Sequence, residues 1–130
     1  MNPSFRVVVV AAIAVVALDT LGSLAARAFG FGYGSLAWGS FIIYAVAGFC
    51  AARSSTLRTA AQAGGAVALV DATLGWAIAW ALGPGRPTAG YIGIGPLLGT
   101  VGLAWLIGIA LGLMGGLVAR FFTRGPNVAG

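Results

Sequence analysis

The chain has 130 residues, of which 60% are hydrophobic and 7% are charged. A soluble globular domain carries about 25% charged residues, so this composition excludes an ordinary soluble domain. It predicts an all-α integral membrane protein whose main surroundings are the lipid bilayer. The seven basic residues are all arginine and stand singly at the ends of apolar runs. That placement is typical of membrane anchoring, and we expect no nucleic-acid partner.

Four apolar stretches, residues 5–28, 34–53, 57–82 and 96–122, are long enough to be membrane-spanning helices, because crossing the hydrocarbon core takes about 20 helical residues. We therefore expect one transmembrane domain, residues 1–130, folded as a four-helix bundle. Thr56 is a candidate N-cap for the third helix. Pro96 is expected in the first turn of the last helix, where its missing N–H costs nothing.

The first stretch has a competing interpretation as a cleaved signal peptide. Arg6 precedes an apolar run, and Ala26-Arg27-Ala28 has the form of a cleavage site. The region between them is long for a signal peptide and contains Asp19. A similar segment recurs around Asp71, where it cannot be a signal, and this favours a retained helix.

The two halves of the chain look related. ALDTLG at residues 17–22 resembles LVDATLG at 69–75, and GFCAAR at 48–53 resembles GGLVAR at 115–120. Each half would then be a helical hairpin, and the two hairpins would be inserted in the same sense as a parallel repeat. The alternative is convergent use of common membrane residues.

The arginines also predict an orientation. Five of them fall on one predicted side, and Arg27 and Arg86 fall on the other. Arginine-rich short loops face the cytoplasm, so both termini are expected there. The alanine, arginine and valine bias is typical of a GC-rich bacterium, which makes the inner membrane the expected location. Residues expected to anchor the bundle at the membrane interfaces are Arg53, Arg120, Trp76 and Trp80.

The two acids of the chain, Asp19 and Asp71, both lie inside apolar helices. Counting 1.5 Å per residue places them at the same depth as Tyr44 and Trp105, so these four residues could form one polar layer that binds an ion or proton. Two carboxyl groups sharing a site would share a proton, because like charges resist joint ionisation.

A purely structural role is the alternative for these aspartates, since interhelical hydrogen bonds are a common use of buried polar groups in membranes. The candidate partners are Thr20, Ser23, Thr73, Arg27, or an arginine of another subunit.

Glycines four residues apart indicate close helix packing. Gly108, Gly112 and Gly116 share one face of the last helix, following Gly95 and Gly99, and Gly64 belongs to a shallower series on the third helix. Such a face serves either packing within the bundle or assembly into a homodimer.

No catalytic motif, metal-ligand cluster or cofactor motif stands out, so we expect a protein that is not an enzyme and has no cofactor. The first hypothesis is an accessory or assembly subunit that meets a larger membrane complex through helix packing. The alternative is a small ion- or proton-coupled transporter or channel that uses Asp19 and Asp71.

Overall fold

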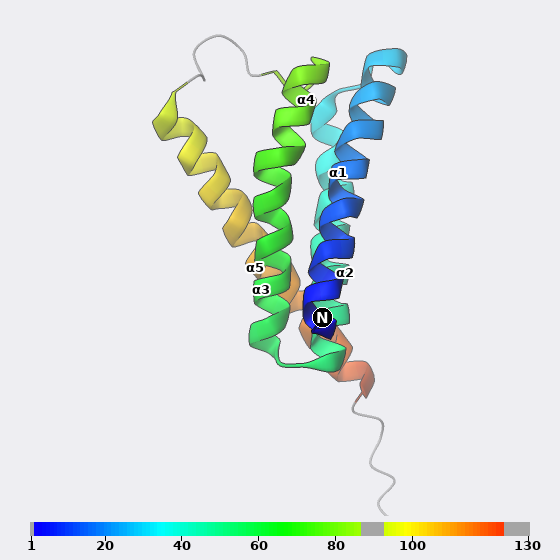
Figure 1. Ribbon diagram of the computed structural model, residues 1–130, viewed down its shortest axis with the longest axis vertical. Coiled ribbons are helices and arrows are strands. Elements are labelled where there is room, and N and C mark those ends of the chain that lie inside the picture. The colour runs from blue at the N-terminus through cyan, green and yellow to red at the C-terminus, as the bar shows by residue number, and fades with distance from the viewer. Residues whose placement is uncertain (1, 87–92, 124–130) are drawn as a thin grey trace, which may run out of the picture.

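The computed structural model describes residues 2–86 and 93–123, and within these ranges the protein is a bundle of long helices with no strand (Figure 1). The elements are α1 (Pro3–Phe29), η1 (Tyr33–Leu36), α2 (Ala37–Ser54), α3 (Leu57–Val70), η2 (Asp71–Gly75), α4 (Trp76–Leu82) and α5 (Ile94–Thr123). They make four spans that are long and apolar enough to cross a membrane. The predicted four-helix bundle is confirmed, and the observed spans begin and end within two residues of the predicted bounds.

The helix ends follow from local sequence. Asn2 caps α1 by accepting a hydrogen bond from the Ser4 N–H, and Gly30 ends it with a φ of 75°, a left-handed conformation that glycine adopts without strain. Thr56 accepts a hydrogen bond from the Thr59 N–H at 3.2 Å and is the N-cap of α3, as predicted. Pro96 falls in the first turn of α5, also as predicted.

The third span is continuous from Leu57 to Leu82, but its middle is not α-helical. The element η2, Asp71–Gly75, is a π-helical turn between α3 and α4. A π turn inserts an extra residue into the helical repeat, is rare, and is frequently found at functional sites. Periodicity along the sequence gave no indication of this turn.

Small residues on the C-terminal half of α5 form a close seam with α2 and α3. Gly112 packs against the backbone of Gly48 and Gly64, and a Cβ added to it would lie 2.5 Å from the Ala60 carbonyl oxygen. Gly108 lies against Ala68 and the backbone of Gly64, and Gly116 lies against Ala60. These glycines therefore serve packing inside the bundle, which is one of the two roles that the sequence left open.

The N-terminal half of α5 leaves the bundle and splays away from α4 (Figure 1). Gly95, Gly99 and Gly102 have no neighbouring side chain or backbone within 4 Å of a Cβ built on them. The glycine series thus continues along α5 beyond the seam, but only its later members are in contact. A groove lies between this half of α5 and residues of α2 and α4.

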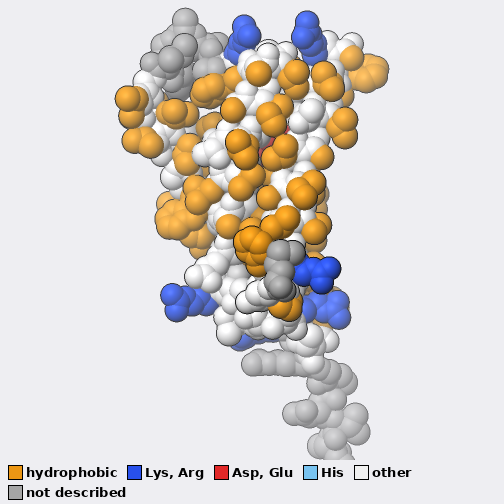
Figure 2. Space-filling model, viewed as in Figure 1, with side chains coloured by type: hydrophobic (Ala, Val, Ile, Leu, Met, Phe, Trp, Pro, Cys, Tyr) orange, Lys and Arg blue, Asp and Glu red, His pale blue; other side chains and the backbone are white. Residues whose placement is uncertain are grey.

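The surface is apolar along the helices and basic at both ends (Figure 2). Arg27 and Arg86 lie at the end where α1 and α4 terminate. Arg6, Arg53, Arg58 and Arg120 belong to the helix termini at the opposite end, and Arg124 lies outside the described residues. An apolar girdle between two charged ends is the surface of a multi-pass membrane protein.

Candidate functional site

The two aspartates meet inside the bundle. Asp19 comes from α1 and Asp71 from the first position of η2, and their side chains are 2% and 5% exposed. Tyr44 of α2 lies with them and is 3% exposed. In the space-filling view the acid atoms are almost hidden between apolar side chains (Figure 2). Charged groups almost never lie this deep without a partner, which marks the cluster as the most unusual chemistry in the molecule.

Each carboxyl group receives one phenol hydrogen bond. The Tyr44 hydroxyl donates to Asp71 Oδ2, and the Tyr33 hydroxyl donates to Asp19 Oδ1 at 2.9 Å. The first bond ties α2 to η2, and the second ties η1 to α1. The two donors stabilise negative charge on the carboxyl groups and hold them in fixed positions.

Gly75 brings the two carboxyl groups to the same point. A Cβ added to Gly75 would overlap Asp19 Oδ2 and lie 2.8 Å from Asp71 Oδ1. The backbone φ of Gly75 is an ordinary helical −60°, so glycine is needed for space and not for conformation. The last residue of the π turn therefore supplies the gap in which the remaining oxygens of both acids face each other.

Two buried polar atoms in this region have no hydrogen-bond partner among the described residues: Asp19 Oδ2 and Ser23 Oγ. Ser23 is four residues after Asp19 and so lies on the same face of α1. A buried polar atom without a partner costs free energy. The unpartnered oxygen of Asp19 is the atom that faces Asp71 across Gly75, and it is therefore the natural place for a proton or cation.

A groove of about 960 Å³ opens beside the acid pair. One wall carries the cluster and nearby aromatic side chains, among them Phe41, Trp76 and Trp80. The other wall is the splayed half of α5, with Leu97, Thr100, Leu103 and Ile107. The groove therefore connects a buried acidic site with a large apolar space.

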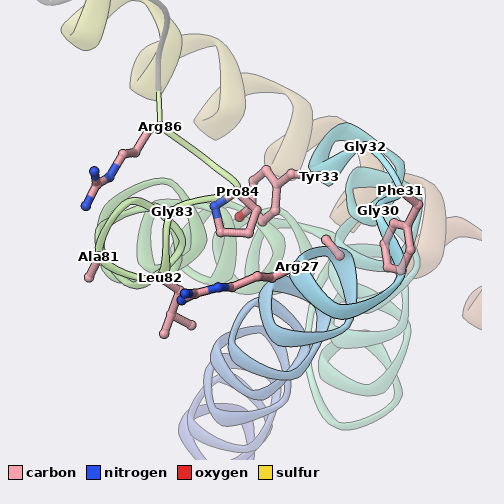
Figure 3. A pocket seen from close by; sticks show the side chains of 11 residues that line it. Arg27, Gly30, Phe31, Gly32, Tyr33, Ala81, Leu82, Gly83, Pro84 and Arg86 are labelled. Atoms are coloured by element: carbon pink, nitrogen blue, oxygen red, sulfur yellow. The ribbon is translucent and has the colours of Figure 1, made fainter.

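A second pocket, of about 560 Å³, lies at the end of the bundle where α1 and α4 terminate (Figure 3). Arg27, Arg86 and Tyr33 contribute to its lining, and Figure 3 shows Tyr33 and Pro84 between the ends of the two helices. Tyr33 and Arg86 line the larger groove as well. Because Tyr33 also holds Asp19, this side chain stands between the acid pair and the end of the bundle.

The structure brings together three of the four residues of the expected polar layer: Asp19, Asp71 and Tyr44. Trp105 lies apart from them, 43% exposed, with its indole nitrogen 3.0 Å from a Cβ built on Gly65. Its indole lies against Gly65 of α3, so depth alone did not determine its neighbours.

The partners suggested by the sequence differ from those found. Thr20 and Thr73 donate to carbonyl oxygens of their own helices, those of Val16 and Leu69, at 2.8 and 2.6 Å. No ion pair involves Arg27 within residues 2–86 and 93–123, where its side chain instead lines the end pocket. Hydroxyl groups do bind the acids, but they are phenols from other helices.

Trp76 and Trp80 were expected at a membrane interface, and their side chains border the larger groove. Tyr33 was missed as a site residue because it follows a glycine-rich connection, a context typical of interfacial aromatics. The only signal in its favour was its hydroxyl, which needs a partner when buried. Its pairing with Asp19 depends on how that connection folds back over α1.

No protein-family model matches this chain, and no curated protein or solved structure is significantly similar to it. The residues that the structure describes contain no group of three metal-ligating side chains.

Proposed function

We propose that this protein is a small proton-coupled transporter of the bacterial cell membrane, in which Asp19 and Asp71 share one proton. The supporting observation is that Asp19 Oδ2, buried and without a hydrogen-bond partner, faces Asp71 Oδ1 across Gly75. A single proton between them would give Asp19 Oδ2 a hydrogen bond and remove one of two like charges. The orientation with both termini in the cytoplasm is part of the proposal.

Energetics support a shared proton over two free charges. One aspartate near the centre of a membrane helix costs about 2.5 to 3.5 kcal/mol on insertion scales, and a second charge beside it adds repulsion. Phenol donors offset part of this cost. Such a pair takes up and releases protons as its surroundings change, which is the property a coupling site requires.

The cavities provide access to the pair. The groove reaches both aspartates from the apolar side, and the end pocket reaches Tyr33, the hydrogen-bond donor to Asp19. A coupling site has to communicate with both a substrate space and water. We assign the groove to the substrate and the end pocket to proton exchange.

Infrared titration of the purified protein tests the shared proton directly. A protonated carboxyl group has its own C=O stretching band, and this band should be present in the parent protein at neutral pH. It should change in Asp19→Asn and in Asp71→Asn, and remain in Thr73→Val, whose hydroxyl lies in the same π turn but bonds Leu69. No such band at neutral pH would reject the proposal.

Transport is tested in liposomes that contain a pH-sensitive dye. An imposed proton gradient should collapse faster than in protein-free liposomes when a candidate substrate is supplied on the opposite side of the membrane, and both Asn variants should remove the difference. Substituting Na⁺ for H⁺ gradients in the same vesicles identifies the coupling ion. A flux carried by Na⁺ alone would assign the site to a metal cation instead of a proton.

Assembly with another membrane protein is the second candidate. It is favoured by the exposed apolar side chains along the splayed half of α5, including Ile94, Leu98 and Leu103, which could pack against a partner helix. Native mass spectrometry of gently extracted protein distinguishes the two. A stoichiometric larger membrane protein would support an accessory subunit, whereas the chain alone or as a homodimer would support the transporter.

A further inference from the structure

The groove is far larger than a proton site needs. Its volume of about 960 Å³ lies at the upper end of the range of about 300 to 1,000 Å³ that small-molecule sites occupy. It exists because α5 packs closely only at its later glycines and diverges before them. A transporter built on the acid pair would therefore hold an organic molecule in this space, and the walls indicate its chemistry.

The walls are mostly apolar and aromatic. Trp76 and Trp80 contribute from α4, Phe41 and Tyr44 contribute from α2, and leucine and isoleucine side chains face them from α5. Asp19 and Asp71 border the same space. An apolar body would be favoured by burial, and a positive charge would be favoured by aromatic faces and by the acids.

The charged groups around the groove favour a cation. The described residues that line it include three with formal charges: Asp19, Asp71 and Arg86. Arg86 is exposed at the edge of the groove, and its Nε donates to the Trp80 carbonyl oxygen at 2.9 Å, so its charge is directed at the backbone. The acids are buried and therefore less screened by water, so they dominate the electrostatics inside the groove.

We propose that the groove binds a hydrophobic organic cation, whose charge takes the place of the proton shared by Asp19 and Asp71. This inference rests on the proposed proton site and names its substrate class. When the cation binds, the proton leaves the carboxyl group for water, and no covalent bond of the cation changes. The net charge of the site is the same before and after exchange, so the cation and the proton compete for one position.

Tetraphenylphosphonium and tetraphenylborate are the probes, because they have the same shape and opposite charge. Binding is followed by the fluorescence of the groove tryptophans, Trp76 and Trp80. We expect the phosphonium to bind and the borate not to bind. We also expect phosphonium binding to release about one proton, measured with a dye in weakly buffered detergent solution.

Asp71→Asn should raise the Kd for tetraphenylphosphonium about tenfold or more, because it removes a desolvated opposite charge. Thr73→Val is the matched control from the same turn and should leave the Kd unchanged. Thr100→Trp fills the groove from α5 without altering an acid. It should weaken phosphonium binding while the carboxyl band in the infrared titration is retained.

Four results would overturn this inference. Equal affinity for the two probes would mean that the groove recognises only an apolar body, such as a lipid chain. Phosphonium binding without proton release, or unaffected by Thr100→Trp, would place the cation elsewhere. If the phosphonium does not bind while the infrared titration shows the shared proton, the substrate class is wrong and the proposed proton site stands.

Discussion

Gly75 lies directly against the Asp19 carboxyl group, so that a methyl group added to Gly75 would overlap Asp19 Oδ2. The contact joins the first span of the bundle to the π turn of the third. It also explains why Asp19 and Asp71 can lie so close, since any larger side chain at this point would separate them. The proton site proposed for this protein therefore depends on Gly75 having no side chain.

Gly75→Ala should lower the free energy of unfolding by about 1 to 3 kcal/mol, the usual cost of overpacking a filled core. Asp19 cannot move aside freely, because Tyr33 holds its other oxygen. The measurement is reversible denaturation in detergent micelles followed by circular dichroism. Gly99→Ala is the control: its Cβ would meet nothing within 4 Å, and alanine should stabilise the helix by up to about 1 kcal/mol. Equal effects at the two positions would contradict the geometry.

Tyr44→Phe should cost more stability than Tyr33→Phe. Tyr44 is buried, and loss of its hydroxyl leaves Asp71 Oδ2 without a donor, at a cost of about 1 to 3 kcal/mol. Tyr33 is only partly buried, so water can replace its hydroxyl and the cost should be near 0.5 to 1.5 kcal/mol.

A double-mutant cycle separates the hydrogen bond from general packing. Tyr44→Phe in an Asp71→Asn background should cost less than it does in the parent protein, with a coupling energy of about 0.5 to 3 kcal/mol. The pair Tyr44 and Asp19 should couple more weakly. Strict additivity for Tyr44 and Asp71 would mean that their hydrogen bond contributes nothing to folding.

The sequence predicted the spans and placed the two acids at the same height along the bundle, because hydropathy and helical rise determine both. It also identified the glycine face of α5 and left its partner open. The rotation of each helix about its axis was harder to predict from the sequence. Trp105 has the same predicted depth as Asp71, yet it faces Gly65 on α3, because the crossing of α5 against α3 decides which side of the helix faces the acids.

No pattern in the sequence predicted two features of the site. The π turn at Asp71–Gly75 lies against α1, and nothing in DATLG distinguishes it from an α-helical turn. The bond from Tyr33 to Asp19 requires the chain to reverse at Gly30 and fold over the end of α1. Both are products of packing between segments, which local propensity does not encode.

Gly112→Leu should detach α5 from the bundle. The position faces the backbone of α2 and α3 at once, with the Ala60 carbonyl oxygen 2.5 Å from a Cβ built there, so a leucine side chain has no space. We expect loss of the folded state, or aggregation, measured by size-exclusion chromatography and by protease sensitivity in detergent. Gly102→Leu is the control on the same helix, since its Cβ would be in open space. A folded and monodisperse Gly112→Leu would rule out this seam.

Cysteine labelling tests the predicted orientation. In a Cys50→Ser background, Gly32→Cys probes the connection after α1 and Ser55→Cys probes the connection after α2, at the opposite end of the bundle. Both positions are exposed, and Gly32 has an ordinary φ of −68°, so neither substitution should strain the backbone.

The end that carries Arg6, Arg53, Arg58 and Arg120 should face the cytoplasm. A membrane-impermeant maleimide should therefore label Gly32→Cys in intact cells and label Ser55→Cys only after permeabilisation. The reverse pattern would place the end pocket, with Arg27 and Arg86, on the cytoplasmic side and would invert the direction in which the proton site exchanges with water.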